Sequence, residues 1–133
     1  MIDVPTEDLR LMLEAGYLYL AMKRLKEAKQ VFEGVCALAP ESDVPLVALG
    51  NVYFGENNFE ESIKIYKKAL TLVPASAFAK AYLGEAYFFY GKKEESCKIL
   101  KEASLTDPHG KSGEFARSLL DLIEKGFNPQ ASK

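Results

Sequence analysis

The protein is a chain of 133 residues, of which 48% are hydrophobic and 27% are charged. This composition is typical of one globular domain or one short repeat array, and it excludes a largely disordered chain. Seventeen Lys and Arg against nineteen Asp and Glu give a formal net charge of −2, which argues against a surface for nucleic acid or anionic membrane.

The cellular compartment is indicated by three features of the chain. Met1 to Glu7 lacks the basic and then apolar plan of a signal peptide. No apolar run approaches the roughly 18 residues that a membrane span needs. Only two cysteines are present, Cys36 and Cys97, too few for a disulfide framework. We therefore expect a cytoplasmic protein in a reducing compartment.

Five positions carry the same or a similar residue in three copies spaced 34 residues apart. The columns are Gly16, Gly50 and Gly84; Tyr19, Tyr53 and Tyr87; Ala28, Ser62 and Ser96; Phe32, Tyr66 and Leu100; and Pro40, Pro74 and Pro108. A fixed period of this length indicates stacked supersecondary units. We expect a lead-in over 1–8, repeats over 9–42, 43–76 and 77–110, a capping helix at about 111–126, and a tail over 127–133.

Each unit is predicted to contain two amphipathic helices. In the second unit, Ser42 or Asp43 can cap the first helix, and Gly55 with the following asparagines can end it. The inward face of the next helix comprises Phe59, Ile63, Tyr66 and Leu70. A glycine at one helical position in all three units indicates close approach of the neighbouring helix. Glu60–Lys64 and Glu94–Lys98 have the i, i+4 spacing of ion pairs on a solvated face.

These motifs resemble the tetratricopeptide repeat (TPR). Leu49-Gly50-x-x-Tyr53, Ser62-x-x-x-Tyr66 and Pro74 are similar to the Leu-Gly-x-x-Tyr, Ala-x-x-x-Phe and Pro of that 34-residue pattern. The resemblance covers about residues 9–110. It departs from the pattern where Met12, Leu46 and Lys80 replace a tryptophan and where serine replaces alanine in two copies. The resemblance implies an all-α, right-handed superhelical solenoid with a concave groove.

In the TPR fold, a stripe at repeat positions 2, 5, 9 and 12 of each first helix lines the concave side. Here the stripe comprises Arg10, Leu13, Tyr17 and Leu20; Val44, Val47, Asn51 and Phe54; and Phe78, Ala81, Glu85 and Phe88, with Tyr82 beside it. Nine of these twelve stripe residues are apolar or aromatic. Because a soluble monomer rarely exposes so large an apolar strip, we expect a partner to cover it.

The stripe is therefore the candidate partner-binding groove. Its expected occupant is an amphipathic helix or an extended apolar segment of a protein client. The chain's own N-terminus, its tail or a second copy, as in a homodimer, are the alternatives. A clamp for a client's C-terminal carboxylate is disfavoured, because only Asn51 fits its pattern of Lys, Arg and Asn; the other such positions hold Leu13, Tyr17, Phe78 and Tyr82. Nucleic-acid and membrane partners are not expected.

A finer resemblance concerns the end of the first repeat. Val31-Phe32-x-x-Val35-Cys36-x-Leu38-x-Pro40 looks like the small chaperones of bacterial type III secretion. The resemblance implies a protein of the bacterial cytosol that holds a needle or translocator subunit before export, and it allows for a second co-chaperone. A TPR scaffold or self-associating assembly subunit with no export client remains the alternative.

Enzymatic and metal-binding chemistry finds no support in the sequence. Gly110-Lys111-Ser112 resembles the end of a phosphate-binding loop, but Leu105 stands where that motif needs glycine. His109 is the single histidine, and Cys36 and Cys97 lack the Cys-x-x-Cys spacing of a zinc or redox site. We therefore expect no enzyme activity, no catalytic or metal-binding residues and no cofactor.

Overall fold

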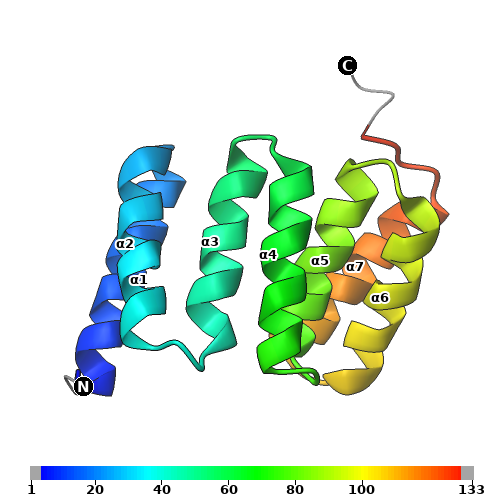
Figure 1. The fold of residues 1–133 in the computed structure, drawn as a ribbon. Helices are drawn as coiled ribbons and strands as arrows, with labels where there is room; N and C mark the ends of the chain where they lie inside the picture. The colour runs from blue at the N-terminus through cyan, green and yellow to red at the C-terminus, as the bar shows by residue number, and fades with distance from the viewer. Residues whose placement is uncertain (1–3, 130–133) are drawn as a thin grey trace.

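The computed structural model describes residues 4–129, and over that range it contains α-helices and no strand (Figure 1). The helices are α1 (Thr6–Ala21), α2 (Leu25–Leu38), α3 (Asp43–Gly55), α4 (Phe59–Leu72), α5 (Ala77–Phe89), α6 (Lys93–Thr106) and α7 (Lys111–Glu124). The prediction of an all-α tandem-repeat solenoid is confirmed. Residues 1–3 of the expected lead-in and 130–133 of the expected tail lie outside the described residues.

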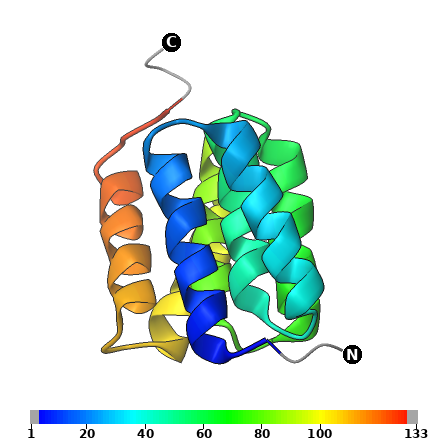
Figure 2. The same cartoon turned by 90° about the vertical axis from the view of Figure 1, so that its left-hand side faces the viewer.

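The helices pack as successive antiparallel pairs, α1 with α2, α3 with α4 and α5 with α6, and α7 follows as the last helix. In the described part of the chain, each odd-numbered helix contacts the next odd-numbered one, whereas α2, α4 and α6 do not contact each other. The odd-numbered helices therefore form the inner, more closely packed row of a curved array. Figure 2 views the array from the α1 and α2 end.

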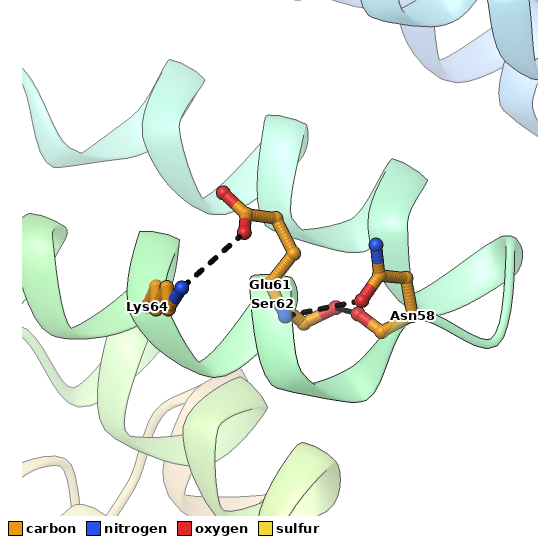
Figure 3. Close-up of polar contacts among 4 residues, drawn as sticks. All are labelled: Asn58, Glu61, Ser62 and Lys64. Atoms are coloured by element: carbon orange, nitrogen blue, oxygen red, sulfur yellow. Dashed lines mark hydrogen bonds and ion pairs between the residues drawn. The ribbon is translucent and has the colours of Figure 1, made fainter.

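Capping residues and turns explain where the helices of the second repeat begin. Ser42 accepts a hydrogen bond from the Val44 N–H at 3.2 Å, so the prediction that Ser42 caps the first helix of this repeat, α3, is confirmed. Asn58 caps α4 and accepts a hydrogen bond from the Glu61 N–H at 3.3 Å (Figure 3). Asn57, between the two helices, has φ of 62°, a left-handed conformation that asparagine tolerates.

That left-handed position recurs once in each repeat. Lys23 with φ of 61° and Gly91 with φ of 90° stand 34 residues before and after Asn57. Lysine is uncommon in this conformation, so the first repeat contains a strained turn where the third has glycine. The same backbone turn therefore joins the two helices of every repeat despite three different residues.

The repeated glycines lie where helices pack most closely. A Cβ atom at Gly50 would lie 2.3 Å from Cε1 of Tyr66, and one at Gly16 would lie 2.3 Å from the same atom of Phe32. At Gly84 the nearest atom, Cδ2 of Leu100, would be 2.4 Å away. The prediction of a close approach is confirmed, and the Gly column packs against the Phe, Tyr and Leu column of the same repeats.

The serines that replace the alanine of the TPR pattern bond to those glycines. The Ser62 hydroxyl donates to the Gly50 carbonyl at 3.0 Å, and Ser96 donates to the Gly84 carbonyl at 2.6 Å. Both serines are fully buried. A buried hydroxyl without a partner would destabilise the fold, so these bonds explain how serine is tolerated at this position.

Three expectations differ from the structure in detail. α1 begins at Thr6, inside the expected lead-in. The Pro5 carbonyl accepts the first hydrogen bonds of the helix, from the N–H groups of Asp8 and Leu9. Lys64 pairs with Glu61 at 4.0 Å (Figure 3) and Lys92 with Glu95 at 3.8 Å, both at i, i+3. The predicted i, i+4 pairs Glu60–Lys64 and Glu94–Lys98 are absent from the ion pairs among residues 4–129.

The start of the expected tail is packed against the last repeat. The Phe127 ring lies 6.0 Å from that of Phe88, and Pro129 is buried. The described part of the tail therefore belongs to the folded unit, because Phe127 packs on a ring of the last repeat. Within residues 4–129, no helix combines the length and apolar character needed to cross a bilayer.

Candidate binding groove

The inner row of helices contains an open cavity of about 440 Å³ formed by α1, α3 and α5. Its lining residues are Tyr17, Leu20, Ala21, Asn51, Phe54, Gly55, Tyr82 and Glu85. A smaller cavity of about 200 Å³ lies between α5 and α7, lined by Phe78, Ala81, Tyr82, Lys111, Ser112 and Phe115. Tyr82 lines both cavities, which we together call the groove.

Aromatic rings form the walls of the groove. The Tyr82 ring contacts Phe78 on its own helix at 5.4 Å between centroids and Phe115 of α7 at 5.3 Å. Phe54 packs edge-to-face against Phe59 and Phe89, at 5.1 and 5.2 Å. These contacts hold the rings in fixed positions, so the groove exposes a preformed apolar surface.

Polar groups meet on the floor of the larger cavity. The buried Tyr66 of α4 donates a hydrogen bond from its hydroxyl to Oδ1 of Asn51 at 2.5 Å, and Tyr17 of α1 lines the same cavity as Asn51. The electrostatic influence of Glu85 reaches both Tyr66 and Tyr82. A mostly apolar pocket with a few convergent polar groups is the usual construction of a binding site.

Burial changes the acid–base properties of this floor. It raises the pKa of the Glu85 carboxyl from 4.5 to about 7, because the charged form loses hydration. Burial likewise raises the pKa of Tyr17 to about 12, with a further increase from Tyr82 and a smaller opposing effect of the Asn51 side chain. The pKa values of Tyr66 and Tyr82 are raised mainly by burial as well. All three tyrosines are therefore neutral at physiological pH.

The structure divides the eleven residues predicted for the groove into four groups, of which the last, Val47 and Phe88, is buried in the core. Six line the larger cavity: Tyr17, Leu20, Asn51, Phe54, Tyr82 and Glu85. Phe78 lines the smaller one with Tyr82. Leu13 is half-buried against the core of the first repeats, and Val44, 37% exposed at the start of α3, lines neither cavity.

Two predicted groove residues, Val47 and Phe88, belong to the core instead. Val47 is 0% exposed, because α3 is central and has neighbours on both sides as well as its own partner helix. Phe88 is 5% exposed, because α7 and Phe127 cover the last repeat. The stripe rule ignores the capping helix, and for this reason it overestimates the open surface of the third repeat.

Several lining residues were not predicted from the sequence. Ala21 and Gly55 follow the ends of the stripe, and Phe115 comes from the capping helix. Tyr66 was expected only in the core. A signal for its role does exist: Tyr66 is the one hydroxyl-bearing member of the Phe32, Tyr66 and Leu100 column, and Asn51 is the polar stripe residue of the same repeat.

Other candidate chemistry is not assembled in the described residues. Cys36 and Cys97 pack against core clusters as small apolar side chains. At the start of α7, the Asp107 carboxylate accepts a hydrogen bond from the Gly113 N–H at 3.3 Å, so the place where a phosphate would bind a helix N-terminus already holds an anion. No group of three potential metal-ligating side chains is found within residues 4–129.

Comparisons with known proteins agree with this architecture. Two family models described as tetratricopeptide repeat match residues 9–42 and 45–76. A comparison with curated protein sequences finds no match. Among solved structures, the Yersinia enterocolitica type III secretion translocator chaperone SycD is similar with a TM-score of 0.78 and 14% identity, over 88% of this chain and 90% of that chain.

Two further structures extend the likeness. PcrH in complex with the chaperone-binding region of PopB has a TM-score of 0.74 and 12% identity, over 89% of this chain and 95% of that one. The first TPR of Spaghetti (RPAP3), bound to the HSP90 peptide SRMEEVD, has a TM-score of 0.72 and 19% identity, over 90% of this chain and 99% of that one. At these identities the likeness concerns the fold. The repeat matches, the helix pairs and this likeness together show that the chain is a tetratricopeptide repeat protein whose fold is similar to that of the translocator chaperones.

Proposed function

We propose that the chain binds an extended apolar segment of another protein in the groove. The observation that carries the proposal is the open cavity of about 440 Å³ on the inner row, with aromatic walls and a polar floor. Rigid aromatic side chains are enriched where single residues contribute most to binding energy. The groove offers such side chains from three different helices, Tyr17, Phe54 and Tyr82.

The shape of the groove favours an extended segment over a helix. The two cavities are separate spaces that share Tyr82, each large enough for one or a few side chains. An extended segment places successive anchors into successive pockets, whereas a helix of about 10–12 Å diameter needs one continuous trough. We therefore propose that an apolar side chain enters each cavity, on either side of Tyr82.

The client we propose is a translocator subunit of a type III secretion system, held in the bacterial cytosol before export. SycD is a type III secretion translocator chaperone, and another of its structures holds a peptide of the translocator YopD. PcrH is bound to the chaperone-binding region of PopB. This support favours a translocator over a needle subunit. The HSP90 peptide bound by the Spaghetti domain has an acidic end, and no Lys or Arg lines the larger cavity here to receive one.

The test is capture of the client from the native cell by tagged protein, followed by mass spectrometry. Wild type is compared with Tyr82→Ala in the groove and with Leu105→Ala on α6, where Leu105 is 80% exposed and away from both cavities. A client recovered by wild type and Leu105→Ala but lost with Tyr82→Ala, at equal helical content, supports the proposal. A client recovered equally by all three proteins contradicts it.

Self-association is the second candidate, favoured by one observation. Leu11 and Leu18 on the outer face of α1 and Met22 at its C-cap are 53, 63 and 55% exposed, although the end of a solenoid needs a polar surface. A second structure of SycD contains an alternative dimer. Light scattering over a range of concentrations tests this candidate: a dimer that Leu18→Glu dissociates and Tyr82→Ala does not assigns the contact to α1, and a monomer at all concentrations excludes it.

A further inference from the structure

We propose that the segment bound in the groove carries a lysine or arginine side chain, which forms an ion pair with Glu85. The groove would then select apolar segments that contain one basic residue at a fixed distance from their anchors. This inference rests on the proposed function and adds the chemistry of the ligand to it.

The position of Glu85 is the first support. Its side chain lines the larger cavity between Tyr82 of the same helix and the residues of α1 and α3. Glu85 is the one charged residue among the residues that line this cavity. An acidic group in an apolar cleft concentrates its field there, because the walls have a low dielectric constant.

The second support is that the carboxylate lacks a partner in the free protein. None of the hydrogen bonds or ion pairs found within residues 4–129 involves the Glu85 side chain. The groups that face it are neutral hydroxyls, Tyr66 of α4 and Tyr82 of α5, and their own interactions with Glu85 are repulsive when they ionise. Asn51 of α3 and Tyr17 of α1 line the same cavity and are uncharged, and Oδ1 of Asn51 already accepts the hydrogen bond from Tyr66.

Binding makes the lack of a partner more costly. Glu85 keeps some contact with water through the open side of the cavity, and a bound segment would displace that water. A buried carboxylate must then take up a proton or meet a cation. Apolar anchors alone would leave it unpaired, whereas a lysine or arginine side chain can extend its methylene groups along the aromatic walls and place its charge on Glu85.

The experiment selects peptides from a phage-displayed library of random dodecapeptides. The baits are the wild type, Glu85→Gln, Glu85→Lys and Glu94→Gln, in which an exposed carboxylate on α6 is the matched control. Circular dichroism establishes that each bait is folded. We expect the wild type and Glu94→Gln to enrich apolar peptides with Lys or Arg at one position. Glu85→Gln should keep the apolar anchors without the basic residue, and Glu85→Lys should favour Asp or Glu there.

A direct affinity measurement completes the test. Replacing the basic residue of the best selected peptide by norleucine should weaken binding to the wild type at least tenfold and to Glu85→Gln less than twofold. Equal enrichment of basic residues on wild type and Glu85→Gln overturns the inference, as do apolar peptides without a basic residue on wild type. The proposed function fails separately, if wild type enriches no apolar motif or if Tyr82→Ala enriches the same peptides.

Discussion

The Tyr66 hydroxyl donates a hydrogen bond to Oδ1 of Asn51 at 2.5 Å, and this bond joins the core of the second repeat to the floor of the groove. The ring of Tyr66 is fully buried and fills the space left by Gly50, while its hydroxyl reaches the inner row. One side chain therefore packs the two helices of a repeat and positions a polar group of the cavity.

Tyr66→Phe should keep the fold and reduce the free energy of unfolding by about 0.5–1.5 kcal/mol, the usual contribution of one hydrogen bond. The ring and its packing against Gly50 stay in place, so only the bond to Asn51 is lost. Urea denaturation measures the change, and Tyr90→Phe is the control, because Tyr90 is 43% exposed. If Tyr66→Phe and Asn51→Ala turn out strictly additive in a double-mutant cycle, the two side chains are not coupled.

Gly50→Ala and Gly34→Ala should have opposite effects on stability. Both glycines are inside helices, where alanine is favoured by about 1 kcal/mol. A Cβ atom at Gly50 would meet the Tyr66 ring at 2.3 Å, whereas one at Gly34 would meet nothing within 4 Å. We expect Gly34→Ala to raise the melting temperature and Gly50→Ala to lower it. A rise for both would show that the helices can move apart at the glycine column.

Phe88→Ala should destabilise the protein by about 3–5 kcal/mol, the cost of removing a buried phenylalanine. Phe88 is packed among residues of α6, α7 and Phe127. Leu105→Ala, at an exposed position near the end of the neighbouring helix, should change stability by about 0.5 kcal/mol or less. Thermal unfolding compares the two. If Phe88→Ala changes stability only slightly, Phe88 is not a core residue and lies in the open groove instead.

Glu85 should make stability fall as the pH rises from about 4.5 to about 7, opposite in sign to a carboxylate whose pKa is lowered by folding. The pKa of Glu85 is 4.5 in the unfolded chain and about 7 in the folded one, so the native state binds the proton more tightly. Its contribution is fully present below pH 4.5 and is lost as pH rises through 7. The loss amounts to about 3 kcal/mol for a shift of this size.

Glu85→Gln removes this dependence, because the amide does not titrate. The difference in unfolding free energy between Glu85→Gln and the wild type should therefore grow in favour of the variant from pH 5 to pH 8. Urea denaturation at each pH gives that difference directly, since other titrating groups contribute equally to both proteins. A difference that stays constant over this range would mean that Glu85 is hydrated in the folded state.

The 34-residue period was sufficient to predict the fold, because each column has a local physical reason. The glycines allow close packing, the serines find partners on the preceding helix, and the left-handed turn recurs at Lys23, Asn57 and Gly91. The stripe, together with Tyr82 beside it, also included six of the eight residues that line the larger cavity.

The burial of individual stripe residues and the role of Tyr66 could not be predicted from the stripe, because it treats all three repeats as equivalent. Val47 is buried because the second repeat has neighbours on both sides. Phe88 is buried because the chain continues into α7 and Phe127, which cover it. Tyr66 reaches the groove from an outer helix, which the stripe on the inner helices does not include. These differences depend on the position of each repeat in the array, and the periodic pattern does not encode that position.

The most direct test of the groove is calorimetric titration of the segment of the captured client that binds the wild type. We expect Tyr82→Ala to weaken binding at least tenfold, because this side chain lines both cavities, and Leu105→Ala to bind like the wild type. Unchanged affinity with a correctly folded Tyr82→Ala variant would contradict the account and place the client elsewhere on the protein.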